Sequence, residues 1–486
     1  MTGTRSDYRI TFAVVTAGVL AYALLQSLVV PVLTTLQTEL HTTQGTVTWV
    51  LTAYLLSASV FTPIMGRVGD MVGKERIFVL TMAALGLGSL LAALASSVGV
   101  MIIARVIQGI GGGVLPLGFG IVRDEFPEGK VSGAVGAIAS LAAVGTGVGI
   151  VLAGPIVDAL DYHWLFWLPM IVCLAAAVAA HLLVPESPVR SGGRISWLPA
   201  ILLSGCLVAL LVGLSEAPEW GWGSVKVIGL IGLAVVVGIG WVLAEQRATT
   251  PLIDMRMMRR RAVWTNNLVA LLIGSGMYAV FAFLPEFVQT PRSTGYGFDA
   301  SIIQSGLIML PSTAMSFVLG LYAGRLAHWI GGKWVVLVGC VVAAASLVMF
   351  AYAHEHKWQL YIASGIEGIG FGLIFAAMSS LVVAAVPPDQ TGVASGMNAN
   401  IRTIGGAIGA AVMGSLVTSR MRSDGLPEES GYTLSFAVLG IALLAAAVVA
   451  LAIPGGAPAA ELPGDEPEHG ELAILAGGTV VGLKAE

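Results

Sequence analysis

A few polar and charged residues interrupt the long apolar runs of this chain. Arg105 lies within the apolar run 98–121, and Gln108 follows it by about one helical turn. Glu367 is the one acid near the middle of any long apolar run. An ionic group in such a place is costly and normally faces protein or water rather than lipid. These residues are therefore the first candidates for chemistry.

Glu367 has the chemistry of a proton carrier. Burial disfavours the charged form of a carboxyl, which suits a group that binds and releases protons near neutral pH. The same carboxyl could instead attract a cationic substrate, remain a neutral structural group, or pair with a basic side chain. Arg105 and Gln108 can face one cavity, since residues three apart share a helix face. The alternative is that Arg105 is a polar brace between helices.

Asp70 lies in a polar segment, Gly66–Arg76, between the apolar runs 47–65 and 77–95. Glycines at 66, 69 and 73 allow a tight turn and close helix approach. Asp70 can pair with a nearby cation or cap a helix N-terminus. A short cationic loop between long apolar helices is typical of a cytoplasmic hairpin in a membrane protein.

Composition places the whole chain in a membrane. Only 11% of its 486 residues are charged, and 56% are hydrophobic. A soluble chain of this length would need more charge to cover its surface. The 62 glycines agree, because membrane helices pack through small residues. The three cysteines lie in apolar runs and indicate neither a disulfide framework nor a metal site.

Apolar runs long enough to cross a bilayer recur along nearly the whole sequence. We predict fourteen spans, at 10–33, 47–66, 75–96, 98–121, 131–157, 163–184, 196–215, 225–245, 262–288, 300–324, 333–353, 358–384, 393–419 and 433–453. An even number of spans puts both termini on one side. Most of the 24 Lys and Arg residues fall inside if that side is the cytoplasm. We therefore expect a multi-pass protein of the cell membrane with cytoplasmic N- and C-termini.

Internal sequence repeats divide the chain into two similar halves. Arg105-Val-Ile-Gln-Gly-Ile-Gly111 is echoed by Ser364-Gly-Ile-Glu-Gly-Ile-Gly370, and the Gly66–Lys74 pattern by Gly324–Lys333. Two six-span halves with the substrate site between them are the plan of many secondary transporters. The expected organisation is a cytoplasmic N-terminus (1–9), an N-terminal six-helix bundle (10–190), a two-helix insert (191–250), a C-terminal six-helix bundle (251–453) and a disordered cytoplasmic tail (454–486).

Ordered motifs carry a family resemblance over about residues 10–453. They are Trp49-Val-Leu-Thr-Ala-Tyr54-Leu-Leu running into Gly66–Arg76, then Arg105-x-x-Gln108-Gly109-x-Gly111, then Asn398-x-Asn400-x-Arg402-x-x-Gly405-Gly406-x-x-Gly409. With fourteen spans, this order resembles the drug:proton antiporters of the major facilitator superfamily. The resemblance implies an all-α fold of two pseudo-symmetric six-helix bundles plus two extra helices.

The resemblance also implies roles. Arg105, Gln108 and Glu367 would serve proton coupling or gating, and Asp70 would be a conformational latch rather than a plain turn residue. The implied conformational glycines are Gly66, Gly73, Gly145, Gly149 and Gly154, the last three on one face of the fifth span. Cavity candidates are Tyr22, Gln26, Trp49, Tyr54, Tyr278, Gln304, Asn398, Asn400 and Arg402, with packing, anchoring or capping of span ends as the alternative for each.

Some positions depart from the family pattern. Its first span usually carries an Asp and an Asn before the proline that is Pro31 here, and the matching residues are Tyr22 and Ser27. In the span-5 motif Ile150 replaces a proline, and Met71 replaces the usual cation after Asp70. These changes leave the expected fold intact and weaken the case for ordinary proton coupling.

The expected function is export of small amphipathic organic compounds, such as drugs or antibiotics, driven by a proton that neutralises Glu367. The expected partners are the substrate, protons and the lipid bilayer, with no cofactor, metal or nucleic acid, and the protein is expected to be a monomer. A uniporter or importer of one metabolite is the first alternative. A membrane-bound enzyme or receptor is disfavoured, because the sequence shows no paired carboxylates within the spans, no metal-ligand cluster, no catalytic dyad and no sizeable soluble domain to carry chemistry.

Overall fold

The computed structural model describes residues 8–187, 196–248, 251–422 and 426–454. Within these ranges the protein is helical, and its only β-type pairing is an isolated bridge between Met421 and Pro427. The all-α prediction is confirmed for this part of the chain. The predicted disordered tail (454–486) lies, but for its first residue, outside the described residues.

Within these described ranges, fourteen helices are long and apolar enough to cross a membrane, as the sequence predicts. The first six spans are α1 (Tyr8–Leu28), α3 (Gln44–Val72), α4 (Lys74–Ala93), the pair α5 (Val98–Gly109) and α6 (Val114–Glu125), α7 (Glu128–Ala159) and α8 (Trp164–Leu183). Two further spans are α9 (Trp197–Trp220) and α10 (Val225–Arg247). The last six are α12 (Arg261–Gln289), α13 (Ile302–Ile330), α14 (Gly332–Tyr352), α15 (Lys357–Ala384), α16 (Thr391–Thr418) and α17 (Glu429–Ala450).

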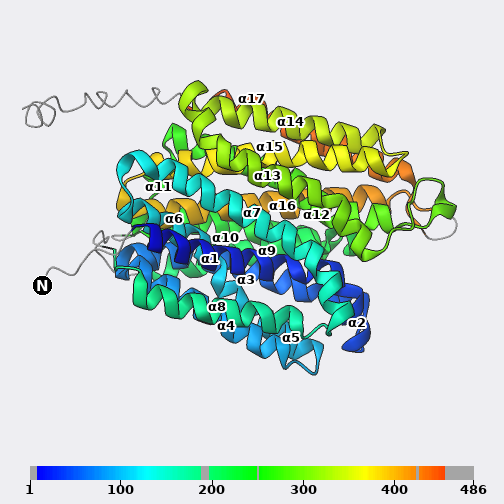
Figure 1. Cartoon of the computed structure of the whole chain (residues 1–486), viewed down its shortest axis with the longest axis horizontal. Helices are drawn as coiled ribbons and strands as arrows, with labels where there is room; N and C mark the ends of the chain where they lie inside the picture. Colours follow the sequence, from blue (N-terminus) through cyan, green and yellow to red (C-terminus); the bar gives the residue numbers. More distant parts are fainter. Residues whose placement is uncertain (1–7, 188–195, 249–250, 423–425, 455–486) are drawn as a thin grey trace, which may run out of the picture.

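The spans run side by side along the length of the molecule (Figure 1). The first six spans, blue to cyan-green, occupy the lower part of the view, and the last six, green to orange-red, the upper part. We call these two sets the first and second halves. We call the end of the bundle that contains Gly73, on the left of Figure 1, the hairpin end.

The turn at the hairpin end is tighter than predicted. The sequence suggests a polar loop over Gly66–Arg76, but α3 continues to Val72 and α4 begins at Lys74. Gly73 alone separates them, with φ at +136°, a conformation that side chains disfavour. Asp70, near the end of α3, and Lys74, the first residue of α4, form an ion pair of 3.8 Å (Nζ to Oδ1) across this turn. Asp70 is therefore a buried helical residue and not a residue of a wet loop.

The fourth span is interrupted at its glycine run. Helix α5 ends at Gly109, a 3₁₀ turn (η2) covers Ile110–Gly113, and α6 follows. A Cβ atom added at Gly109 or Gly112 would lie 2.3 Å from a side-chain atom of α3, at Ser57 or Thr62 respectively. The run therefore allows close packing onto α3.

Helix α9 packs against α3 and α16, whereas α10 packs on α9. Leu203 and Leu207 of α9 share a core cluster with Val393 and Met397 of α16. Only 11% of the most apolar stretch of α10 is buried, compared with 44% for α9. In a bilayer α10 would thus face mainly lipid, and α9 covers the side of the molecule where α3 meets α16.

The halves also meet along α7 and α13. Two glycines allow α7 and α13 to approach closely: Gly147 lies opposite Thr313, and Gly320 lies opposite Ser140. The three glycines predicted to share one face of the fifth span divide between two partners instead. Gly145 and Gly149 face α1, at Ala23 and Ser27, whereas Gly154 faces Ile303 of α13. The step of five residues from 149 to 154 turns the helix by about 140°, which explains the change of partner.

Candidate functional site: a cavity between the halves

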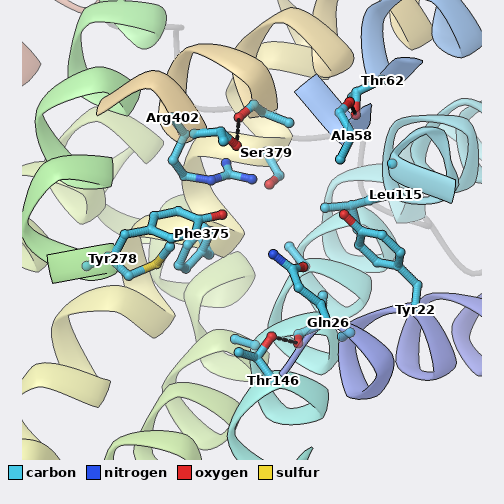
Figure 2. A pocket seen from close by; sticks show the side chains of 18 of the residues that line it. Tyr22, Gln26, Ala58, Thr62, Leu115, Thr146, Tyr278, Phe375, Ser379 and Arg402 are labelled. Carbon is cyan, nitrogen blue, oxygen red and sulfur yellow. Dashed lines mark hydrogen bonds between the residues drawn. The ribbon is translucent and has the colours of Figure 1, made fainter. Parts of the chain in front are cut away.

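A central cavity lies between the two halves (Figure 2). Its walls come from α1, α3, α6 and α7 on one side and from α12, α13, α15 and α16 on the other. Of the cavity candidates predicted from the sequence, the lining residues are Tyr22, Gln26, Tyr54, Tyr278, Asn398, Asn400 and Arg402. The structure thus brings together residues that are up to 380 positions apart in the sequence.

Arg402 is the one charged side chain among the residues that line the cavity. Figure 2 shows Arg402 and Tyr278 on one wall, with Tyr22 and Gln26 on the opposite wall. The guanidinium carbon lies 5.0 Å from the centre of the Phe375 ring. Among the described residues no carboxylate forms an ion pair with it.

Several lining groups have no hydrogen-bond partner within the described protein. They are the hydroxyls of Tyr54, Ser59 and Ser395 and both polar atoms of the Asn400 amide. All four side chains are buried, Tyr54 and Asn400 to 1% and 2% exposure. Asn398 differs, since its amide donates to Asn267 Oδ1 at 2.9 Å. Buried polar groups are normally paired, so the unpaired ones mark where a ligand or water can bind.

Trp49 and Gln304 do not line the cavity, contrary to the prediction. Trp49 lies more than one turn before Tyr54 on α3, nearer the end of the molecule opposite the hairpin end. Gln304 lies in the first turn of α13, exposed, and accepts a hydrogen bond from Lys357 Nζ at 3.1 Å. Both residues are too close to the ends of their helices to reach the middle of the bundle.

Arg105 and Gln108 are fully buried behind the cavity wall rather than on it. Arg105 Nε donates to Val50 O at 3.0 Å, and its Nη1 donates to Gln108 Oε1 at 2.7 Å. Gln108 Nε2 donates in turn to Ser89 Oγ at 3.0 Å. The guanidinium also lies 4.5 Å from the ring centre of Tyr54, which does line the cavity. Arg105 therefore links α3, α4 and α5 and reaches the cavity only through Tyr54.

Glu367 is 1% exposed and lies between α15 and α13. Neither of its carboxylate oxygens has a hydrogen bond of good geometry. The next residue, Gly368, packs directly against Ser312, whose side chain lines the cavity. Glu367 is thus an unpaired acid one layer behind the cavity wall.

Asp70 joins the two halves at the hairpin end. It is fully buried, and its carboxylate oxygens accept hydrogen bonds from Gly392 N at 3.3 Å and Val393 N at 3.1 Å. These amides are in the first turn of α16, where a helix attracts negative charge. A Cβ atom on Gly66 would lie 2.5 Å from Gly392 O, so the glycine allows this contact.

Arg123 and Asp124 extend the same contact, and the sequence reasoning did not single them out. Arg123 Nη1 donates to Thr391 Oγ1 of the second half at 2.8 Å. Asp124 accepts a hydrogen bond from Lys74 Nζ at 2.6 Å and another from Ser187. Their position at the end of the fourth span, beside a predicted inner loop, was the available signal.

The sequence reasoning also missed much of the cavity wall. Ser312, Ser316 and Ser379 line it, as does Phe375. Serines within apolar spans give little signal, because they can bond to carbonyls of a helix and cost little there. Their spacing of four residues on α13 (312 and 316) was the one hint of a polar face.

Within the described residues, fourteen helices able to cross a membrane surround a largely apolar cavity between two halves, which is the architecture of a membrane transporter. The family model described as Major Facilitator Superfamily matches residues 15–410 and 294–482. The chain belongs to this superfamily.

Similar proteins include resistance and export proteins of bacteria. A tetracenomycin C resistance and export protein of Streptomyces glaucescens is 28% identical, covering 86% of this chain and 77% of the relative. A multidrug resistance protein B homolog of Mycobacterium tuberculosis is 31% identical, covering 78% and 71%. A puromycin resistance protein of Streptomyces alboniger is 28% identical, covering 86% and 85%.

A solved structure agrees on the fold. The human organic anion transporter MFSD10 superposes with a TM-score of 0.67 over 92% of this chain and 100% of that chain. At 15% sequence identity this similarity shows the fold alone.

Proposed function

We propose that this protein exports small amphipathic organic compounds, such as drugs or antibiotics, and that a proton gradient drives the export. The relatives named for drug resistance and export support the substrate class and direction. The cavity also supports this substrate class, since aromatic and apolar side chains surround a few polar groups there. We propose that the protein lies in the cell membrane as a monomer, with both termini in the cytoplasm.

In this orientation the hairpin end faces the cytoplasm. The contacts of Asp70 and Arg123 with α15 and α16 then close the cavity on the cytoplasmic side. Asp70 acts as the latch, because its negative charge stabilises the first turn of α16 only while the halves touch. Release of the latch would open the cavity to the cytoplasm, and the α7–α13 contact would let the halves rock. Such switching needs only that proton and substrate bind the two states with different affinity.

The observation that carries proton coupling is the unpaired carboxyl of Glu367. Among the described residues Glu367 has no paired cation and no hydrogen bond of good geometry, which is costly for a buried carboxylate, so binding a proton there stabilises the protein locally. The packing of Gly368 against Ser312 of the cavity wall supports a proton site at Glu367, close behind that wall. Protonation of Glu367 from the outside, with α13 between it and the substrate, would couple the gradient to the state of the cavity.

The test is export by the Glu367→Gln variant in everted membrane vesicles. Glutamine keeps the size of the side chain but cannot exchange a proton, so gradient-driven substrate accumulation should fall to the level of vesicles that lack the protein. Glu219→Gln, at an exposed position on α9, is the matched control and should transport normally. Normal gradient-driven accumulation by Glu367→Gln would disprove the coupling role.

Facilitated, gradient-independent transport of one metabolite is the second candidate. It is favoured by the missing first-span acid, since Tyr22 and Ser27 stand where the family usually has an Asp and an Asn. The Ser27 hydroxyl donates only within its own helix, to Ala23 O and Leu24 O, both at 3.1 Å. Under this alternative, wild-type vesicles would equilibrate substrate at the same rate with and without a proton gradient.

A further inference from the structure

Building on the proposed export function, we propose that the cavity selects aromatic compounds that carry a negative charge, such as a carboxylate or an acidic phenol. Arg402 is the residue that determines this selectivity. The argument depends on the charge of the wall, on the free hydrogen-bonding groups around it, and on the contrast between the two arginines within spans.

The cavity wall carries positive charge and no acid. A guanidinium stays protonated in proteins and offers five N–H donors. Arg402 is half-buried at the wall, and no other lining residue is charged. A cation in a low-dielectric site without an anion is costly, so an anionic ligand would relieve that cost. A cationic ligand would add to it.

Two buried acids, Asp70 and Glu367, do not line the cavity and so do not offset this charge at the wall. Asp70 is at the hairpin end, where the α16 amides and Lys74 contact its carboxylate. Glu367 lies behind α13 and is absent from the wall. Among the described residues, neither of these acids forms an ion pair with Arg402.

Comparison with Arg105 argues against a structural role for Arg402. The hydrogen bonds of Arg105 are structural, since it donates to Val50 O and Gln108 Oε1 within the protein. Arg402 makes no hydrogen bond among the described residues and lies over the Phe375 ring at 5.0 Å. An arginine stacked on an aromatic face keeps its N–H groups available for a carboxylate, which it can bind in a bidentate way.

The rest of the wall specifies an aromatic compound with oxygen atoms. Phe281, Phe371 and Phe375 supply apolar faces, together with the ring of Tyr278. The unpaired Tyr54 hydroxyl and Asn400 amide supply hydrogen-bonding groups at the same cavity. A planar aromatic acid can thus stack on the rings, bond to these groups and place its negative charge at Arg402.

The test uses two dyes built on the same xanthene ring system. Fluorescein is anionic at neutral pH, and tetramethylrhodamine ethyl ester is cationic. We expect purified wild-type protein to bind fluorescein more tightly, measured by fluorescence anisotropy without any proton gradient. Arg402→Gln should weaken fluorescein binding by about tenfold or more, the scale of one lost charge-assisted contact. Binding of the rhodamine should be unchanged or tighter, which also shows that the variant is folded.

Two further variants sharpen the result. Arg402→Lys keeps the charge and should retain part of the preference for fluorescein. Arg325→Gln removes an equal charge from an exposed position on α13 and should bind both dyes as the wild type does. Equal binding of the two dyes by the wild type, or the same dye preference in Arg402→Gln and Arg325→Gln, would overturn the proposal. A preserved fluorescein preference without gradient-driven export would contradict the proposed function alone.

Discussion

Arg105 and Arg402 are both cations within membrane spans, but their surroundings differ. Three helices enclose Arg105, and its hydrogen bonds satisfy Val50 O and the Gln108 amide oxygen. Arg402 faces the cavity and donates no hydrogen bond to any residue that the structure describes. Residue type and depth in a span are therefore insufficient to separate a brace from a ligand-binding group.

At Arg105 we predict a loss of stability on substitution by methionine. Arg105→Met would leave the buried Gln108 amide oxygen without a donor, at about 1–3 kcal/mol, and would remove the additional hydrogen bond that Val50 O accepts within α3. Thermal unfolding in detergent should show a midpoint several degrees lower than wild type, with transport reduced in proportion. Arg325→Met, at an exposed position, should unfold like the wild type. An unchanged midpoint in Arg105→Met would show that these contacts are not needed for stability.

The sequence predicted the polar cavity residues well where a motif or a rare residue type marked them. Tyr22, Gln26 and Arg402 are examples, and all three line the cavity. The sequence-based prediction was wrong for Gln304. The pattern of polar and apolar residues does not show how far along a helix the cavity extends. It also missed Ser379, since a hydroxyl that can bond within a helix looks the same in a packed span as at a cavity wall.

At the scale of elements, the contact between α3 and α16 joins the two halves at the hairpin end, and under the proposed function it would hold the cavity closed on that side. It depends on a glycine pair, because Gly66 and Gly392 bring the two backbones together. Asp70 then bonds to the amides at the start of α16. The sequence predicted the Asp70 latch only through the family resemblance, since the partner amides lie more than 300 positions away.

We predict that Gly66→Ala favours the state that is open at the hairpin end. The added Cβ atom would lie 2.5 Å from Gly392 O, so α3 and α16 must separate by about 1 Å. Cysteines introduced on these two helices should therefore cross-link less efficiently than in the wild type, and export should slow. The matched control is Gly99→Ala, where the added atom meets nothing within 4 Å. Equal cross-linking in both variants would contradict the gating role of this contact.

At the scale of the whole molecule, the fourteen-span count was predictable because the hydrophobic pattern is strong in each span. How far the helices extend beyond the apolar runs was not predictable from the sequence. Helix α3 continues past its apolar run to Val72, held by the Asp70–Lys74 pair and by contacts with α16. Such tertiary contacts connect residues that no local pattern relates.

Orientation in the membrane can be tested with single cysteines. The native Cys173 and Cys340 are buried and Cys206 lies within α9, so they should give little background labelling. Glu355→Cys is exposed in the loop between α14 and α15, away from the hairpin end, and should react with an impermeant thiol reagent in intact cells. His328→Cys, exposed at the hairpin end, should react only after the membrane is opened. The reverse pattern would place both termini outside.

Helix α9 runs along α16 from Val393 to the neighbourhood of Gly414, where Pro218 lies close by. It is also tied to α16 through Trp222 Nε1, which donates to Ser415 Oγ at 2.6 Å. Because α9 contacts α3 as well, the two gating helices cannot part without sliding against it. A small molecule wedged between α9 and α16 would consequently arrest the transport cycle from the lipid side, as a non-competitive inhibitor that never occupies the substrate cavity.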